Sequence, residues 1–356
     1  MSVPQVVVIV SGFPRHSETF ALTELNALDD AGMLAAVFCT KPGDAGACQP
    51  AALRLLGRVH LLDDDGPARV EEAAYYLEDA DVSGVHAYFA HTPAEVASDL
   101  AAMLGVPFGF SVHARDARKA PREQLFARAQ RAACVVACNT DVIREFDGSG
   151  ARVTLVPHGV DLRRFSPRRT VAETFRILAV GRLVEKKGLH VLVDALSQLH
   201  GAWRLRIVGD GPEKSRLLAQ VRALGLADRV TFAGIVTHDA LAAEYDEADV
   251  VVVPSICDAS GDRDGLPNVV LEAMASAAAI VATDAGAITS AVRDGGTGIV
   301  VPAGDASALR AALRRLAEAP AERRRLGDAA RDVAAREFDA TTCANRFVSV
   351  LREAYA

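Results

Sequence analysis

Short apolar runs alternate with segments of helical periodicity along the whole chain, and this rhythm constrains the fold more than any single motif. Each run suits one strand, and each intervening segment suits a helix or a turn. The alternation is the sequence pattern of parallel sheets covered by helices, so an α/β fold is predicted. The expected strands are 6–10, 35–40, 59–62, 85–89, 108–112, 135–137, 153–156, 175–180, 204–208, 230–233, 250–253, 280–282 and 298–301.

The length of the chain points to more than one domain. At 356 residues it is too long for one ordinary hydrophobic core and fits two domains of typical size. Residues 165–170 contain a proline and two arginines, and they interrupt the alternation. The sequence therefore predicts one domain over 1–167 and a second over 168–339.

Composition excludes several classes of protein. The formal net charge of −7 argues against nucleic acid as the main partner. No run approaches the 18 or so apolar residues of a transmembrane helix, and the N-terminus lacks the pattern of a secretory signal. We therefore expect a cytoplasmic protein.

The six cysteines contain no Cys-x-x-Cys pair, which agrees with a reducing compartment. Cys134 and Cys138 bracket the expected strand 135–137. Their spacing predicts that both side chains point to one face of that strand and pack in the core.

Residues 264–275 place two carboxylates, Asp264 and Glu272, around the start of a helix. Pro267 suits the first helical turn, where its missing N–H costs nothing. The backbone amides that follow are then free to face an anion. Glu272 projects from the same helix face as Asn268, four residues before it.

Residues 175–188 run from an apolar strand through a turn into a helix, and this turn carries two cations. Arg182 follows Gly181, and Lys187 precedes Gly188. Cations at such a turn are suited to phosphate. A helix N-terminus, two cations and an acidic pair fit a nucleoside diphosphate whose far end carries a reacting group.

Taken together, these residues resemble the retaining glycosyltransferases of family 4, the group 1 enzymes with the two-domain GT-B architecture. Further matching pieces are residues 17–20, 113–116, 208–213 and 230–236, so the resemblance spans nearly the whole chain. It implies two Rossmann-like doubly wound domains that face each other across a cleft, with the substrates between them. It also implies that a helix at 340–356 crosses back to pack on the first, acceptor-side domain.

The resemblance assigns the donor site to the second domain. Glu272 would hold the ribose hydroxyls, because a carboxylate accepts hydrogen bonds from both groups of a diol. Arg182 and Lys187 would clamp the diphosphate and stabilise the charge of the leaving nucleotide, in place of a divalent metal. The expected donor-binding residues are Gly12, Arg182, Lys187, Val236, Thr237, Gly265, Leu266, Pro267, Asn268 and Glu272.

Asp264 matches the first glutamate of the acidic pair of the family and is one methylene shorter. The resemblance gives it a place near the donor sugar, where it would act as a fixed negative charge. With Asp262 it also forms a D-x-D string, which chelates a metal in a different glycosyltransferase fold. The surrounding motifs favour the first interpretation, so no metal site and no cofactor beyond the nucleotide sugar are expected.

His113 ends an apolar run, at the carboxyl end of an expected strand where ligand sites gather. By resemblance it approaches the donor sugar and the reaction centre. Asp116 and Glu18 are weaker candidates for acceptor contact, and Ser17 is a candidate cap for the next helix. Gly12 would permit close approach of the backbone to phosphate or acceptor.

Residues 209–214 imitate part of a dinucleotide-binding fingerprint. The third glycine of that fingerprint is replaced by Lys214, and an acidic ribose anchor is missing from the sequence that follows. An NAD-dependent oxidoreductase is therefore the least favoured alternative.

A basic stretch follows His113, and two interpretations of it stay open. It is either a solvated helix face, the usual fate of charge runs, or a docking surface for an anionic lipid or a phosphorylated acceptor. The second interpretation would bring the protein to the inner face of the membrane. The basic residues are Arg115, Arg118, Lys119, Arg122, Arg128 and Arg131.

The sequence thus predicts a retaining glycosyltransferase that moves a hexose-like unit from a nucleoside diphosphate sugar, with UDP as the default, to a hydroxyl acceptor. The acceptor would be a glycan, a lipid-linked sugar or a small aglycone. Two alternatives remain: a non-catalytic nucleotide-sugar-binding protein, and a phosphorylase or sucrose-type synthase on the same fold. Front-side substitution and double displacement both stay open as mechanisms.

Overall fold

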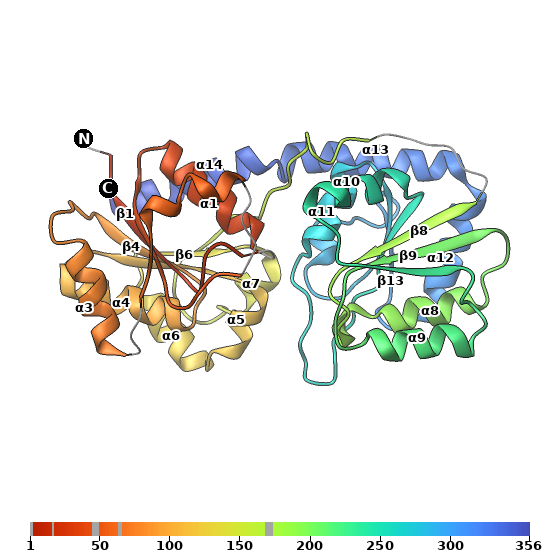
Figure 1. The fold of residues 1–356 in the computed structure, drawn as a ribbon, viewed down its shortest axis with the longest axis horizontal. Helices are drawn as coiled ribbons and strands as arrows, with labels where there is room; N and C mark the ends of the chain where they lie inside the picture. The colour runs from red at the N-terminus through yellow and green to blue at the C-terminus, as the bar shows by residue number, and fades with distance from the viewer. Residues whose placement is uncertain (1–2, 16–17, 45–49, 63–65, 168–173) are drawn as a thin grey trace. The chain divides into compact units, whose positions relative to one another are not determined.

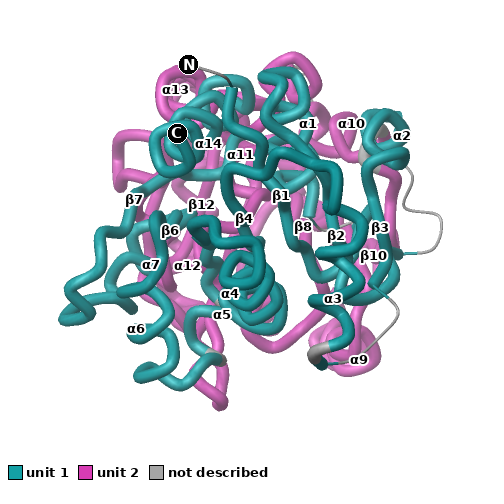
Figure 2. The backbone as a smooth tube through the Cα atoms, turned by 90° about the vertical axis from the view of Figure 1, so that its left-hand side faces the viewer, with its two compact units in different colours: residues 1–159, 340–356 teal, residues 160–339 magenta. Residues whose placement is uncertain are grey.

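The computed structural model describes residues 3–15, 18–44, 50–62, 66–167 and 174–356. Within these ranges, the side chains of Pro67, Arg115, Lys119, His238 and Asp239 are outside the description. The chain divides into two compact units, each with its own sheet and core (Figures 1 and 2). Unit 1 comprises Met1–Gly159 and Ala340–Ala356, and unit 2 comprises Val160–Asp339.

Unit 1 contains a seven-stranded parallel sheet in the order β3-β2-β1-β4-β5-β6-β7. Its strands are β1 Val6–Val10, β2 Leu34–Cys39, β3 Val59–Leu61, β4 Gly84–Tyr88, β5 Phe108–Val112, β6 Cys134–Ala137 and β7 Val153–Leu155. Its helices are α1 Thr19–Asp30, α2 Pro50–Leu53, η1 Leu56–Arg58, α3 Pro67–Tyr76, α4 Thr92–Leu104, α5 Ala114–Lys119, α6 Arg122–Arg131, α7 Thr140–Arg144 and α14 Ala340–Tyr355.

Unit 2 contains a six-stranded parallel sheet in the order β10-β9-β8-β11-β12-β13. Its strands are β8 Phe175–Val180, β9 Trp203–Val208, β10 Val230–Gly234, β11 Val250–Val253, β12 Ala279–Thr283 and β13 Ile299–Val301. Its helices are η2 Glu185–Lys187, α8 Leu189–Ser197, α9 Lys214–Ala223, α10 His238–Glu247, α11 Asn268–Ala275, η3 Ile288–Ser290, α12 Ala306–Glu318 and α13 Pro320–Glu337.

Every expected strand is present, and each of its ends lies within one residue of the expected end. Both sheets have the doubly wound order of a Rossmann fold, in which the direction of winding reverses between the first and the fourth strand. These switch points lie between β1 and β4 in unit 1 and between β8 and β11 in unit 2. Ligands of such sheets bind at the carboxyl ends of the strands beside the switch point.

Helices cover both faces of each sheet (Figure 1). In unit 1, α3 and α4 pack on one face, and α1 and α14 pack on the other. In unit 2, α8, α9 and α12 cover one face, and α10, α11 and α13 cover the other. Each sheet therefore has two apolar layers, which explains why its strands are almost continuously hydrophobic.

Helix α14 belongs to unit 1, although it follows unit 2 in the sequence. Phe347, Leu351 and Tyr355 are buried in the core layer beside α1. The hydroxyl of Tyr355 donates to the carbonyl oxygen of Val85 at 3.1 Å. A Cβ atom on Gly84 would lie 2.2 Å from the Tyr355 ring, so this end of β4 requires a glycine to seat the helix.

The boundary between the units lies at Gly159–Val160, earlier than the expected 167–168. Val160 and Phe165 are buried in the core of unit 2, and Val160 forms a bridge with Asp339. The apolar residues before the proline thus belong to the second core. Residues 168–173, where the break was expected, lie outside the described residues.

The expectation that Cys134 and Cys138 share one face of a strand is wrong. Strand β6 ends at Ala137, so the alternation of faces does not continue to Cys138. Cys134 packs in the layer with α1 and α14. Cys138 packs against the layer with α3 and α4, at the carboxyl edge of the sheet.

Candidate active site

The switch point of unit 2 brings together two segments that the sequence analysis selected separately. β8 ends at Val180 and leads through Gly181 to η2, which carries Lys187. β11 ends at Val253 and leads into the loop that holds Asp264. Gly188 has φ +60°, and a Cβ atom on it would lie 1.9 Å from the carbonyl oxygen of Pro254. A glycine is therefore required for η2 to approach the loop after β11.

Lys187 and Asp264 form an ion pair at this point. The ammonium nitrogen of Lys187 lies 2.8 Å from Oδ2 of Asp264, and the hydroxyl of Ser255 donates to the same oxygen at 2.6 Å. Lys186 pairs with Asp262 at 3.0 Å and lies 3.8 Å from Oδ1 of Asp264. A cation and a carboxylate that were predicted to be catalytic thus form one hydrogen-bonded unit.

The carboxylate of Asp264 is held in its charged form, although the residue is only 7% exposed. Burial opposes the charge, but Lys187, the hydroxyl of Ser255 and Lys186 outweigh burial and lower the pKa of Asp264. Asp264 therefore provides a permanent negative charge at the carboxyl end of the sheet. Both carboxylates of the string Asp262–Asp264 pair with lysines, Asp262 with Lys186 and Asp264 with Lys187.

Arg182 differs from Lys187 because it is exposed and forms no ion pair or side-chain hydrogen bond within the described part of the chain. The aliphatic chain of Lys187 runs beside Gly181, where a Cβ atom would lie 3.5 Å from Cε of the lysine. Among the described residues, the turn after β8 thus presents one free cation, Arg182, and two paired cations, Lys186 and Lys187. This arrangement suits a diphosphate, whose charge exceeds what one cation balances.

Helix α11 begins at Asn268, and Pro267 is its N-cap rather than a residue of its first turn. The backbone amides of Asn268 and Val269 donate to no group among the described residues. Gly265 is fixed because its carbonyl oxygen accepts from the amide of Ala287 at 3.3 Å. Leu266 packs against the core of unit 2. Two free amides at a helix N-terminus form an anion site.

Glu272 lies one turn into α11 and is 8% exposed. The hydroxyl of Tyr245, from α10, donates to Oε2 of Glu272 at 2.7 Å. Burial raises the pKa of Glu272 to about 7, against the opposing effects of Tyr245 and Arg164. Unlike Asp264, this carboxyl group sits close to its protonation midpoint near neutral pH.

Val236 and Thr237 follow β10, on the same sheet edge as η2. Thr237 caps α10, and its hydroxyl accepts from the amide of Ala240 at 3.3 Å. Val236 is partly buried against the core layer that contains Glu272's helix α11. Their expected contact with the donor stays a prediction.

In unit 1, His113 follows β5 and is the N-cap of α5. Its backbone amide donates to Oδ1 of Asp116 at 2.8 Å, and the amide of Ala90 donates to Oδ2 at 2.6 Å. Asp116 is 4% exposed, and burial raises its pKa to about 7. Asp116 therefore joins the ends of β4 and β5 and positions His113, while its acceptor contact stays a prediction.

The ring of His113 lies among other rings in the same unit. Its centroid is 4.8 Å from that of Phe20, 4.8 Å from that of Phe89 and 5.1 Å from that of His158. Burial lowers the pKa of His113 well below its usual value, and His158 and His91 lower it further. The imidazole is therefore neutral at pH 7.

Gly12 and Glu18 lie after β1 and before α1, where both line one small pocket. A Cβ atom on Gly12 would lie 2.6 Å from the carbonyl oxygen of Pro42, so close packing of the backbone requires this glycine. Glu18 is 3.5 Å from Arg15, and burial raises its pKa. Ser17, the candidate helix cap, lies outside the described residues.

The basic stretch forms α5 and α6, and three of its arginines have partners inside unit 1. Arg118 pairs with Asp141, Arg122 donates to the carbonyl oxygen of Asp147 at 2.7 Å, and Arg128 donates to the carbonyl oxygen of Ala90. These contacts favour a structural role for the three residues. Within the described ranges, no helix combines the length and the apolar character that a membrane span needs.

Four residues of these clusters were not selected from the sequence: Lys186, Tyr245, Ser255 and His158. Ser255 lies two residues beyond β11, so its position at a strand end was a usable signal. Lys186 is part of the selected turn, next to Lys187. Tyr245 and His158 gave no such signal, because their contacts join distant segments of the chain.

Two family models match the chain, one mainly in each unit. The family model described as Glycosyltransferase Family 4 matches residues 17–164, and the model described as Glycosyl transferases group 1 matches residues 174–319. WcaL of Escherichia coli strain K12, named as a colanic acid biosynthesis glycosyltransferase, is 27% identical over 83% of this chain and 86% of its own. AmsK of Erwinia amylovora, named as an amylovoran biosynthesis glycosyltransferase, is 32% identical over 48% of this chain and 43% of its own.

A solved structure, Alr3699/HepE of Anabaena in complex with UDP, has a TM-score of 0.84 and 20% identity, and the match covers 98% of this chain and 100% of that chain. The same protein has also been solved with UDP-glucose. The likeness establishes the GT-B fold, with one Rossmann-like sheet in each unit. The two family models, which together match most of the chain, show that it belongs to the family 4, group 1 glycosyltransferases.

Proposed function

We propose that this glycosyltransferase uses a UDP-linked hexose as its donor, transfers the sugar with retention of configuration, and needs no metal ion. The observation that carries the proposal is the cluster at the switch point of unit 2. There the exposed Arg182, the ion pair of Lys187 with Asp264, and the free amides of Asn268 and Val269 share one sheet edge. This cluster offers positive groups for a diphosphate and one fixed negative charge.

In the proposed reaction, the bond between the anomeric carbon and the β-phosphate oxygen breaks, and its electron pair leaves with UDP. The oxygen of the acceptor hydroxyl forms the new bond, and its proton passes to the leaving phosphate. Arg182, Lys187 and the amides of α11 stabilise the growing phosphate charge. Asp264 favours positive character at the anomeric carbon, and His113 of unit 1 contributes to the transfer step.

Glu272 is the proposed ligand of the ribose hydroxyls. Its carboxyl group is buried beside Tyr245, so two hydroxyl donors from the ribose would add to the one donor already present. Hydrogen bonds to the charged form lower a carboxyl pKa. Nucleotide binding should therefore convert Glu272 from a partly protonated group into a carboxylate.

The donor and acceptor classes rest on the relatives. UDP and UDP-glucose are bound in the structures of the Anabaena protein, which supports a UDP-sugar donor here. WcaL and AmsK are named for the biosynthesis of colanic acid and amylovoran, which supports a glycan-building role and a sugar hydroxyl as the acceptor. Contact of α5 and α6 with a membrane is not part of the proposal, because Arg118, Arg122 and Arg128 bind within unit 1.

The proposal is tested by release of UDP from a panel of UDP-sugars, with and without sugar acceptors, after exhaustive chelation. We expect release to continue without metal and to increase with a suitable acceptor. Nuclear magnetic resonance of the product should show the anomeric configuration of the donor. Activity that disappears on chelation and returns only with manganese or magnesium would overturn metal independence, and an inverted product would overturn retention.

A further inference from the structure

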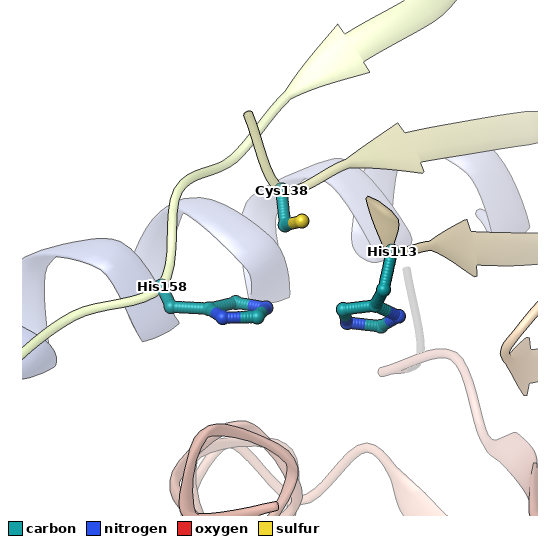
Figure 3. A group of neighbouring side chains, drawn as sticks. All are labelled: His113, Cys138 and His158. Carbon is teal, nitrogen blue, oxygen red and sulfur yellow. The ribbon is translucent and has the colours of Figure 1, made fainter. Parts of the chain in front are cut away.

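A second cluster of reactive side chains lies in unit 1, at the carboxyl ends of three neighbouring strands. His113 follows β5, Cys138 follows β6, and His158 lies three residues after β7. One ring nitrogen from each histidine and the sulfur of Cys138 all lie within 4.8 Å of one another. Figure 3 shows that the three side chains project toward one another from these separate segments.

The chemistry of this cluster is that of a transition-metal site. Two imidazole nitrogens and one thiolate match the ligands that bind zinc with an open fourth position. Burial lowers the pKa of His158 to about 4 and that of His113 well below its usual value, so both rings are neutral ligands at pH 7. Nδ1 of His113 is buried and lacks a hydrogen-bond partner in the described ranges.

Charge in the surroundings also favours a cation. Burial is the main cause that raises the pKa of the Cys138 thiol in the metal-free protein, and the buried Asp116 and Glu24 raise it further. The side-chain amide nitrogen of Asn139 lies 3.2 Å from the sulfur of Cys138, where it would donate a hydrogen bond to a thiolate. The same two carboxyl groups that disfavour an isolated thiolate would stabilise a metal–thiolate pair.

The geometry needs a small closure to bind zinc. Zn–N distances of about 2.0 Å and Zn–S distances of about 2.3 Å place tetrahedral ligand atoms about 3.3–3.6 Å apart. A separation at the 4.8 Å limit must therefore shorten by about 1.2–1.5 Å, which rotations about side-chain bonds would have to supply. Phe20 stacks on His158 with a centroid distance of 3.9 Å and an interplanar angle of 6°, so one ligand is already oriented. All three residues are partly buried rather than fully enclosed.

We propose that His113, Cys138 and His158 form a binding site for zinc or a similar borderline cation, and that occupation of the site inhibits sugar transfer by engaging His113. The inhibitory part rests on the proposed function, whereas the binding part does not. Magnesium and calcium ions do not suit this site, because they prefer oxygen ligands and the cluster offers nitrogen and sulfur.

The binding test uses the full chain with Cys257→Ser, which removes an exposed thiol. Titration with Co²⁺ should produce a sulfur-to-cobalt charge-transfer absorption that saturates at one equivalent. Zn²⁺ should displace the cobalt ion and remove this absorption. Cys138→Ser should abolish this absorption and weaken zinc binding more than about 100-fold, beyond the loss typical of an outer-shell partner. His158→Gln should weaken binding while retaining the sulfur signal.

Cys134→Ser is the matched control, because Cys134 begins the same strand and packs on the other face of the sheet. It should bind cobalt as the parent does. Absence of a stoichiometric cobalt signal in the parent, or equal loss in the Cys134 and Cys138 variants, would overturn the site. Thermal unfolding of each variant checks that the fold is intact.

The inhibition test measures UDP release during a zinc titration. Release should fall with the affinity measured by cobalt displacement and recover on chelation, while Cys138→Ser should keep its activity and resist zinc. Zinc binding without inhibition would overturn the link to His113. A protein that releases no UDP from any donor would refute the proposed function, yet the cobalt titration would still decide the metal site.

Discussion

Removal of Lys187 should destabilise unit 2 much more than neutralisation of its partner Asp264. Asp264 is 8% exposed as a side chain and Lys187 is 18% exposed. Lys187→Met keeps most of the aliphatic chain beside Gly181 but leaves a buried carboxylate without its nearest cation. Removal of one partner of a buried ion pair typically costs about 3–5 kcal/mol of folding free energy. Lys186, at 3.8 Å, and Ser255 remain, so we expect about 3 kcal/mol.

Asp264→Asn leaves a lysine that can turn toward solvent, and it should cost only about 1 kcal/mol. In the double variant the loss of folding free energy should be smaller than that of Lys187→Met, because no uncompensated buried charge is left. We therefore predict that the losses of folding free energy in the two single variants depart strongly from additivity in a double-mutant cycle.

Trp203 provides the assay, because it is the one tryptophan of the chain and is 3% exposed in the core of unit 2. Its fluorescence during urea unfolding reports on this unit. Lys214→Met is the matched control: Lys214 pairs with Asp210 in the same unit, but the two side chains are 39% and 40% exposed. That change should cost less than about 1 kcal/mol. Equal losses for Lys187→Met and Lys214→Met, or additive losses in the cycle, would refute the reasoning.

Three further predictions concern binding and rate. UDP affinity should fall about tenfold from pH 8 to pH 6, because the pKa of Glu272, raised to about 7, makes the required carboxylate scarcer as pH falls. Calorimetry with Glu272→Gln should show weaker UDP binding that lacks this pH dependence. Arg182→Ala should lower kcat about 10²-fold or more, since it removes a group that stabilises charge in the transition state; a change confined to KM in steady-state assays would contradict this. His113→Ala should lower the transfer rate about 10²-fold and leave UDP affinity unchanged; a folded variant with full activity would remove His113 from the mechanism.

The sequence predicted the fold well because strand positions depend mainly on local pattern. Each strand of the two sheets is a short apolar run between turn residues, and its ends lie within one residue of the expected positions. The domain boundary was less accurate, because the allocation of Val160 and Phe165 depends on which core buries them. Cys138 was misplaced for a similar reason: the end of β6 decides which layer it contacts.

The partners of the candidate site residues were mostly hidden from the sequence. Lys187 and Asp264 were selected separately, 77 residues apart, but nothing in their local sequence indicated that they form an ion pair. Tyr245 reaches Glu272 over 27 residues, from a helix without a distinguishing motif. Strand order brings such residues together, so their contacts require the fold rather than the motif.

Asp264 and Glu272 show why these contacts matter for chemistry. Both are nearly buried carboxyl groups at the two ends of one short segment, and the sequence alone treats them as an acidic pair. Two lysines and a serine lower the pKa of Asp264 despite burial, whereas burial beside a tyrosine raises the pKa of Glu272 to about 7. A group with a permanent charge suits the reacting end of the donor, where a fixed field is needed throughout the reaction. A carboxyl group that loses its proton when the ligand binds suits recognition, because its affinity for hydroxyl donors is linked to that loss. The difference between the two environments therefore supports separate roles for the two carboxyl groups, one in transfer and one in nucleotide binding.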